Sequence, residues 1–263
     1  RGLGDVYKRQ VLDEDFNTLA SLGALKNLDM LVGGDKEFDF NVFYSSVYKA
    51  GQYEGSQYAL PMECNPTLMF VNKTLLQKEG IKVPDNDWTW DDFYDICKTI
   101  VKDSDGDGQM DQFGCYDYTW LQAVYSNGIT PFNQSGTSSN FLDEKFSQSL
   151  EVVKRLEATN RNYQVTSNDF DLGKVAFRPF TFSDYRTYMP YPWRIKKYSG
   201  FEWTCIRMPA GPSGDNRSEM SALMAGMSSR TEKKQCAWDF VKLLTTDTDI
   251  QKLVYLSLIH ISE

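Results

Sequence analysis

Hydrophobic and polar residues alternate along the chain with two different periods. Between residues 15 and 28 an apolar side chain recurs every three positions, which predicts an amphipathic helix. Short apolar runs at 58–61 and 67–71 predict two buried strands, with an irregular connection over 62–66. Because helical and strand-like segments follow one another throughout, the pattern predicts an α/β fold.

The predicted helices carry residues that favour their ends. Gly51 follows a predicted helix over 40–50, and Asn72 begins a short helix that stops at Gly80. Thr89 opens another helix with an acidic first turn, the arrangement of a capping box. The same patterns predict further helices over 143–158 and 231–245 and further strands over 203–208 and 222–228.

The two ends of the chain have sequences of a different kind. One DNA string can encode residues 3–10, and its reverse complement can encode residues 256–263. We therefore expect residues 1–10 and 256–263 to be adapter-derived tails that pack poorly, with the natural chain continuing beyond both. The only histidine, His260, lies in the second tail, so residues 11–255 offer no imidazole for acid–base chemistry or metal binding.

Composition excludes several classes of function. A hydrophobic share of 41% and an aromatic share of 14% in 263 residues indicate a folded chain with room for two domains. The net charge of −8, without a stripe of Lys and Arg, argues against nucleic acid or an anionic membrane as the partner. No apolar run reaches the roughly 18 residues of a membrane-spanning helix. The five cysteines form no CxxC pair, which argues against a zinc site.

A series of short motifs follows one another along the chain. They read DFNTLASLGALKNLD at 15–29, YEGSQYALP at 53–61, LMFVNK at 68–73, GIKVP at 80–84, WDDF at 90–93, GKVAF at 173–177, PAGP at 209–212 and AWDFVKLL at 237–244. In this order they resemble the motifs of the family 1 extracellular solute-binding proteins, which include the maltose-binding proteins. Val71 stands where that family usually has a tyrosine.

The resemblance implies a two-lobed periplasmic-binding-protein-like fold of type II, incomplete at both ends. It implies chain crossings near 62–66, 201–205 and 232–238. The expected N-terminal lobe therefore combines residues 11–63 with 205–235, and the expected C-terminal lobe combines 64–204 with 236–255.

The same resemblance implies a function in import. The chain is expected to be the extracellular substrate-binding component of an ABC importer, not an enzyme. It would hold a sugar or oligosaccharide in the cleft between two lobes, where aromatic rings meet sugar faces and polar groups meet hydroxyls. Expected partners are the ABC permease subunits in the membrane. We expect a monomer, either periplasmic or anchored as a lipoprotein, whose signal sequence lies outside this fragment.

The resemblance also places candidate ligand residues after predicted strands. Asn65 aligns with a common polar ligand position, although a hinge residue bonding its own turn is the alternative. The segment at Tyr116 aligns with an aromatic ligand-binding stretch, in which Trp120 also suits a core position. Trp193 equally suits packing within its own loop. The residues expected to contact ligand are Glu63, Asn65, Tyr116, Asp117, Trp120, Phe182, Tyr185 and Trp193.

The segment between 103 and 111 has the spacing of a calcium-binding loop. Alternating acidic residues around a glycine turn bring several oxygens toward one hard cation. Gly114 stands where such loops usually carry a bidentate glutamate, and an acidic turn without metal is the alternative. A structural Ca²⁺ and no organic cofactor are expected, with ligands from Asp103, Asp105, Asp107, Gln109 through its carbonyl, and Asp111.

Other functions remain open at this level. A carbohydrate-active hydrolase would use two carboxylates, but no family pattern pairs them here. A calcium-stabilised adhesion or structural module is suggested by the acidic loop alone. Within the binding proteins, a non-sugar solute such as glycerol phosphate would suit a basic site built from Arg178, Arg186 and Arg194.

Overall fold

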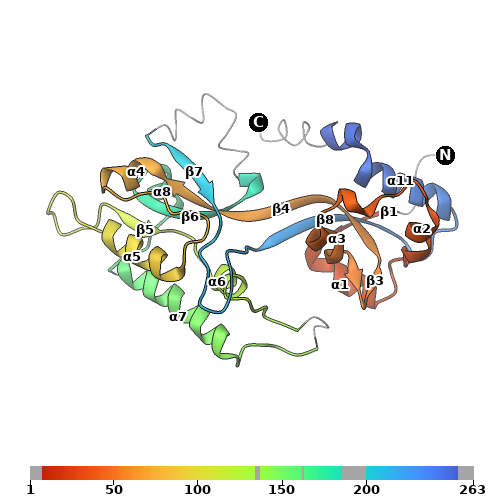
Figure 1. Cartoon of the computed structure of the whole chain (residues 1–263), viewed down its shortest axis with the longest axis horizontal. Coiled ribbons are helices and arrows are strands. Elements are labelled where there is room, and N and C mark those ends of the chain that lie inside the picture. Colours follow the sequence, from red (N-terminus) through yellow and green to blue (C-terminus); the bar gives the residue numbers. More distant parts are fainter. Residues whose placement is uncertain (1–7, 134–136, 162, 185–199, 254–263) are drawn as a thin grey trace. The chain divides into compact units, whose positions relative to one another are not determined.

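The chain is α/β, as its sequence pattern predicts (Figure 1). The computed structural model describes residues 8–133, 137–161, 163–184 and 200–253. The chain divides into two compact units, the first formed by Arg1–Asn65 with Met220–Glu263 and the second by Pro66–Glu219. One long strand, β4 (Ala59–Asn72), contributes to both units.

The first unit is built on β4 and two further strands of the same sheet. Strand β8 lies between β1 and β4, and it pairs antiparallel with β1. The elements of this unit are β1 (Lys8–Leu12), α1 (Asp13–Ser21), α2 (Asp29–Gly34), the 3-10 helix η2 (Phe40–Val42), α3 (Ser45–Ala50), β2 (Gln52–Tyr53), β3 (Ser56–Gln57), β8 (Met220–Met227) and α11 (Lys234–Thr246).

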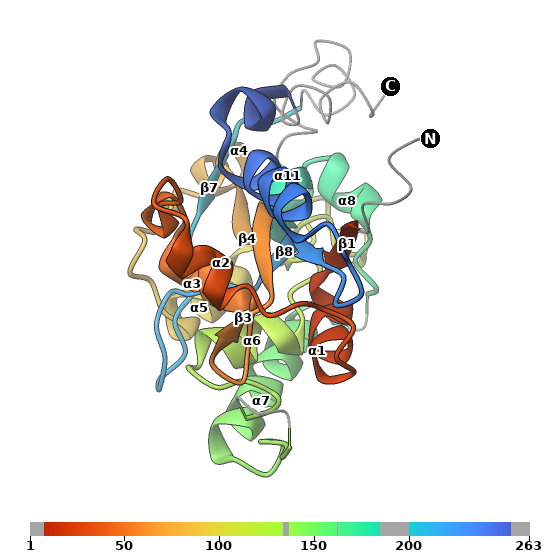
Figure 2. The same ribbon diagram turned by 90° about the vertical axis from the view of Figure 1, so that its right-hand side faces the viewer.

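Side chains of β8 alternate between two apolar clusters, because successive residues of a strand face opposite sides. Met224 packs with Phe16 of α1 on one side. Met227 packs with Leu28 and with Trp238 of α11 on the other. Helices α1 and α11 therefore cover opposite faces of this part of the sheet (Figure 2).

A polar network ties α11 to the segment that follows α2. The Trp238 indole and the Lys242 ammonium both donate to the Asp35 carboxylate, each at 2.8 Å. The hydrogen bond from Lys242, followed by that from Trp238, lowers the pKa of Asp35 to about 2. Asp35 therefore stays ionised throughout the physiological range.

The second unit surrounds the other half of β4. Strand β6 pairs antiparallel with β4 and parallel with β5, while β7 pairs antiparallel with β4. Its elements are α4 (Lys73–Lys78), α5 (Trp90–Ile100), β5 (Phe113–Cys115), α6 (Trp120–Ser126), α7 (Glu144–Thr159), α8 (Ser167–Asp171), β6 (Val175–Thr181) and β7 (Trp203–Ile206).

Both faces of this second sheet region are covered. Met69 and Val71 lie in a core with α4, α5 and α7, whereas Phe70 between them lies in an aromatic cluster on the opposite face. The Phe70 ring lies 5.5 Å from Phe170 and 4.4 Å from Trp203, measured between centroids. Two rings of this aromatic face, those of Phe170 and Phe180, lie under the guanidinium of Arg178.

Most predicted helix ends are confirmed. The Asn72 side chain accepts from the Leu75 amide at 2.9 Å and caps α4. Thr89 and Asp92 form the predicted capping box at the start of α5. The long helix predicted over 143–158 is α7, capped by Asp143.

Three predictions about local structure are wrong. The predicted irregular connection over 62–66 is part of the continuous strand β4. The helix predicted to reach residue 28 ends at Ser21, because Gly23 adopts a left-handed φ of 65° and Leu25 then forms a bridge with Ser228. The helix predicted over 40–50 is split into η2 and α3.

The unit boundaries match one expected crossing and differ from the others. The boundary between Asn65 and Pro66 lies within the expected 62–66 crossing. Residues 205–219 were expected in the first lobe but belong to the second unit, because β7 pairs with β4 and Met208 is buried in the second core. Residues 236–255 were expected in the second lobe but belong to the first, since Trp238 is buried in its core.

The first tail is described only from Lys8 onward. Lys8, Arg9 and Gln10 pair with β8 in the edge strand of the sheet, not in a central strand. Residues 256–263 lie outside the described part of the chain. Within the described residues, no helix is long and apolar enough to cross a membrane.

Candidate functional site

The segment that follows β5 forms one wall of a groove in the second unit. Residues 115–120 line this groove of about 860 Å³ together with side chains of α7 and the residues after it. The Tyr116 amide donates to the Phe177 carbonyl at 3.0 Å and so fixes the segment to β6. Ligand sites in α/β proteins commonly form where parallel strands such as β5 and β6 end.

Asp117 lies at the sharpest point of this segment. Its φ is 65°, a left-handed conformation that is unusual outside glycine. After it, Thr119 caps α6 with Gln122 in a reciprocal capping box. The strained residue is thus held between a strand and a helix start, as is common at binding sites.

Arg178 is the charged residue on the aromatic face of β6. It pairs across the ladder with Phe70. Its guanidinium carbon lies 4.1 Å from the Phe180 ring centroid, 4.8 Å from that of Tyr116 and 5.6 Å from that of Phe170. These cation–π contacts hold a side chain that is only 16% exposed.

The Arg178 donors lack acceptors within the described part of the chain. The Asp117 Oδ2 atom lies 3.8 Å from Nη2, an ion-pair distance that is too long for a hydrogen bond. The buried Nε atom has no partner. A buried donor without an acceptor is costly, so the Nε atom of Arg178 could still donate a hydrogen bond to an oxygen atom.

The Arg178–Asp117 pair presents donors beside an acceptor. A hydroxyl group can accept from a guanidinium N–H and donate to a carboxylate at the same time, whereas an ionised carboxylate or phosphate can only accept. An anion would also meet the charge of Asp117. With Tyr116 beside them, these two groups are suited to a neutral polyhydroxylated molecule.

Glu219 is a further polar residue of the second unit. Its carboxylate accepts from Gln122 Nε2 at 3.3 Å, which links it to the cap of α6. Burial raises its pKa above the ordinary value. Its sequence context gives no signal for this position.

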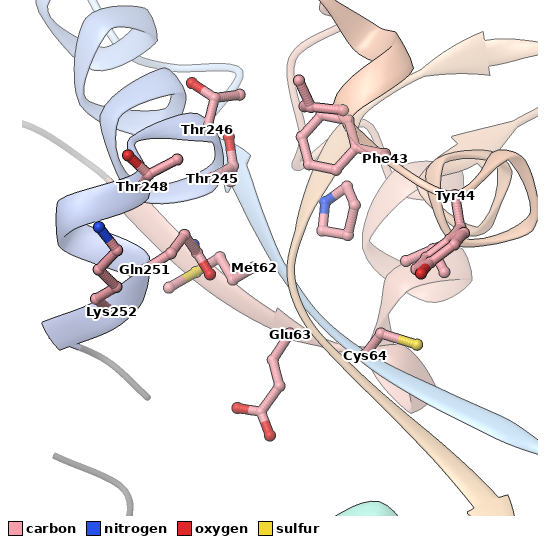
Figure 3. Close-up of a pocket in the computed structure, with 13 residues that line it drawn as sticks. Phe43, Tyr44, Met62, Glu63, Cys64, Thr245, Thr246, Thr248, Gln251 and Lys252 are labelled. Atoms are coloured by element: carbon pink, nitrogen blue, oxygen red, sulfur yellow. The ribbon is translucent and has the colours of Figure 1, made fainter. Parts of the chain in front are cut away.

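A separate pocket of about 590 Å³ lies within the first unit. Figure 3 shows it bounded by Phe43 and Tyr44 on one side and by the helical residues from Thr245 to Lys252 on the other, with β4 between. Tyr44 is 82% exposed. Glu63 lies at this pocket.

The predicted ligand residues therefore fall in different places. Glu63 lines the pocket of the first unit, and Asn65 lies inside β4 at the boundary between the two units. Phe182 follows β6, is half-buried and lines neither cavity. Tyr185 and Trp193 lie outside the described residues.

Three of the predicted residues, all from the aromatic stretch, lie together. Tyr116, Asp117 and Trp120 all line the groove of the second unit. Trp120 is 41% exposed, so a core position is wrong for it. The sequence predicts Arg178 only as part of a phosphate site, yet a charged residue inside the apolar strand sequence VAFRPF is itself a signal for a functional position.

The acidic loop gathers part of its predicted ligand set. Carboxylate oxygens of Asp103, Asp105 and Asp111 lie within 4.8 Å of one another. Asp107 instead accepts from the Gln109 amide at 2.7 Å. Hydrogen bonds from backbone amides, that of Gly108 first, lower the pKa of Asp103.

Gly114 explains why the loop lacks a glutamate at its last position. This residue lies in β5, where an added Cβ would come within 2.4 Å of the Cys97 Cβ. The close contact with α5 leaves no space for a side chain. A cation in this loop would therefore need water or another carboxylate for its remaining ligands.

Two α/β units that share a continuous strand define a two-lobed, type II periplasmic-binding-protein-like fold. The chain belongs to the bacterial extracellular solute-binding proteins, whose family model matches residues 11–250. The fold class and the family implied by the sequence motifs are thereby confirmed.

Solved structures with the same fold include several solute-binding proteins. An ABC substrate-binding protein from Listeria monocytogenes in complex with cycloalternan is 20% identical, with a TM-score of 0.68 over 92% of this chain and 62% of that one. A solute-binding protein from Agrobacterium radiobacter in complex with ribitol is 18% identical, with a TM-score of 0.69 over 95% and 64%. A cyclo/maltodextrin-binding protein complexed with maltotetraose is 18% identical, with a TM-score of 0.67 over 93% and 61%. The chain thus spans less than two thirds of the length of these structures.

Proposed function

We propose that this protein is the substrate-binding component of an ABC importer and that its solute is a neutral sugar, sugar alcohol or oligosaccharide. The observation that carries the proposal is the Arg178–Asp117 pair. Its guanidinium is mostly buried and lacks hydrogen bonds among the described residues, while its nearest carboxylate stands at 3.8 Å. The oxygen of a sugar hydroxyl can accept a hydrogen bond from Arg178, and its O–H can donate one to Asp117. The sugars and the polyol bound by the similar solved structures support the same class of solute.

Glycerol phosphate is the second candidate, and Arg178 is the observation that favours it. A phosphate would accept two hydrogen bonds from the guanidinium. It would also lie close to the Asp117 carboxylate, whose negative charge would repel it. Asp117 is half-exposed and has no closer basic partner than Arg178 among the described residues. We rank the neutral solute first because it suits both members of the pair.

The cellular setting belongs to the same proposal. The binding component of such an importer works outside the cytoplasmic membrane, either free in the periplasm or held by a lipid anchor, and delivers its solute to the permease subunits. We propose that this protein does so as a monomer and without chemical turnover of the solute.

A thermal-shift panel tests the proposal. Each candidate solute is added separately to the protein at about 100 times its Kd, which is taken as micromolar. The solutes are ribitol, mannitol, maltose, maltotetraose, mannobiose, mannotriose and glycerol 3-phosphate. A solute that binds only the folded state should then stabilise it by about 2.7 kcal/mol, and we expect a neutral member to do so. Stabilisation by glycerol phosphate alone, or hydrolysis of an oligosaccharide by stoichiometric protein, would contradict the proposal.

We also propose that the loop from Asp103 to Asp111 binds a structural calcium ion. The gathered oxygens of Asp103, Asp105 and Asp111 support this, since like charges held together in the folded state favour a bound cation. The ion would join the end of α5 to the start of β5. It would have no part in solute chemistry.

Calcium is expected to raise the melting temperature of the protein. At a calcium concentration of about 100 Kd the stabilisation should be roughly 2.7 kcal/mol, and Asp105→Ala should remove it. Asp87→Ala is the matched control, because Asp87 is exposed and lies outside the loop. Equal melting temperatures with calcium and with chelator would identify the loop as an acidic turn only.

A further inference from the structure

A row of aromatic rings leads away from the groove of the second unit. Trp120, which lines the groove, lies 5.8 Å from Phe146 between ring centroids. Phe146 lies 5.0 Å from Phe141, and Phe141 lies 5.6 Å from Phe132. We call these four residues the aromatic row. The row joins α6, the start of α7 and the loop between them (Figure 1).

The aromatic row combines one buried ring with three partly exposed rings, an arrangement that suits a binding surface. Phe146 is 7% exposed and anchors the row, whereas Trp120, Phe141 and Phe132 are 41%, 46% and 52% exposed. Three large rings in sequence thus present part of their surface to solvent. Large aromatic side chains exposed near one another commonly mark a site of interaction.

Hydrogen bonds hold the loop that presents the outer rings. Phe132 forms an antiparallel bridge with Ser139. The Asn140 amide donates to the Pro131 carbonyl, and its side chain donates to the Thr130 carbonyl, both at 2.9 Å. The outer rings are therefore positioned in advance, which lowers the entropic cost of binding a partner.

The chemistry around the row indicates an uncharged partner. No Asp, Glu, Lys or Arg occurs between residues 121 and 142, although 24% of the whole chain is charged. The polar side chains of the loop are instead amides and hydroxyls, such as those of Asn133, Thr137 and Asn140. Flat apolar faces flanked by such groups match pyranose rings, which are apolar on their faces and polar at their edges.

We infer that the aromatic row is an extended subsite for an oligosaccharide, on which successive sugar units stack as the chain leaves the groove. This inference rests on the proposed function and narrows it, because a monosaccharide or short polyol would not reach Phe141 or Phe132. The ligand is thus a linear neutral oligosaccharide, with one end in the groove at Trp120 and further units over Phe141 and Phe132.

Calorimetry with oligosaccharides of increasing length tests the inference. The parent and the double variant Phe132→Ala/Phe141→Ala are titrated with maltose, maltotriose, maltotetraose and longer maltodextrins, and in parallel with mannobiose, mannotriose and longer mannodextrins. In the parent, affinity should rise with length by roughly two- to tenfold for each unit that stacks on a ring. The double variant should bind the shortest saccharide that the parent binds with the same affinity as the parent. Its affinity should not rise as the saccharide becomes longer.

Leu142→Ala provides the matched control. Leu142 is fully exposed, at 102%, and is the neighbour of Phe141 in the chain without belonging to the row. The control should retain the full length dependence. Equal length dependence in the parent and the double variant would overturn the extended subsite, as would a change of oligomeric state in the double variant. Failure of every saccharide to bind the parent would overturn the proposed function itself.

Discussion

Arg178→Met is expected to weaken binding of the preferred saccharide by about 2–3 kcal/mol, or roughly 30- to 150-fold, as judged from hydrogen bonds to charged groups. The guanidinium provides donors that meet no acceptor within the described residues, and the proposed solute would supply one. Methionine keeps a long side chain against the same rings but removes every donor. Isothermal titration calorimetry with the best saccharide of the panel measures the loss.

The same substitution should leave folding stability unchanged or raise it. A mostly buried charge that lacks hydrogen bonds contributes little to stability, and an apolar side chain of similar length is often neutral or stabilising in its place. Methionine sulfur also packs well against aromatic rings such as Phe180 and Tyr116. Loss of binding with retained stability would therefore identify Arg178 as a ligand residue.

Arg155→Met is the control for this prediction. Arg155 also lies over an aromatic ring, with its guanidinium carbon 4.2 Å from the Tyr94 centroid, but it belongs to α7 and is not in contact with Asp117. Its substitution should leave saccharide affinity unchanged. Equal affinities of the parent and Arg178→Met would show that the solute is bound elsewhere.

Trp238→Ala is expected to destabilise the protein by about 3–5 kcal/mol, the usual cost of removing a buried aromatic side chain. Trp238 is 1% exposed, packs against Phe38 at 5.2 Å between ring centroids and donates to Asp35. Urea denaturation followed by circular dichroism gives the change in the free energy of unfolding.

Trp238→Phe separates the ring from the hydrogen bond. Phenylalanine keeps most of the apolar contact, and Asp35 keeps Lys242 as a partner at 2.8 Å. The cost should therefore fall to about 1 kcal/mol for the lost hydrogen bond, with a further contribution from the smaller ring. Equal destabilisation by both variants would show that the contact with Asp35, and not packing, dominates at this position.

The sequence itself determined where several helices begin and how strand residues alternate. Asn72, Thr89 and Asp143 were each expected to begin a helix, and each does, because a cap depends only on residues within a few positions of one another. The alternation at Met69, Phe70 and Val71 follows from the strand period alone. The family is likewise readable from the order of short motifs, which needs no coordinates.

Sheet continuity and unit boundaries required the tertiary structure. The segment over 62–66 contains a proline and several polar residues, so it suggests a break, yet ladder pairing with distant strands keeps β4 continuous. The assignment of residues 205–219 depends on β7 pairing with β4, a contact that no local pattern encodes. Non-local pairing overrides local preference here.

The tertiary structure also decided which residues form the candidate site. Tyr116 and Asp117 were predicted from a motif, but their value as a site depends on Arg178, which is distant in sequence and reaches them only because β6 lies beside β5. The aromatic row likewise joins Trp120 to Phe132 through side chains of α7 and the preceding loop. The sequence by itself determined which residues begin helices, alternate in strands and identify the family. The tertiary structure alone decided which of them meet, because contacts between distant segments depend on how whole elements pack.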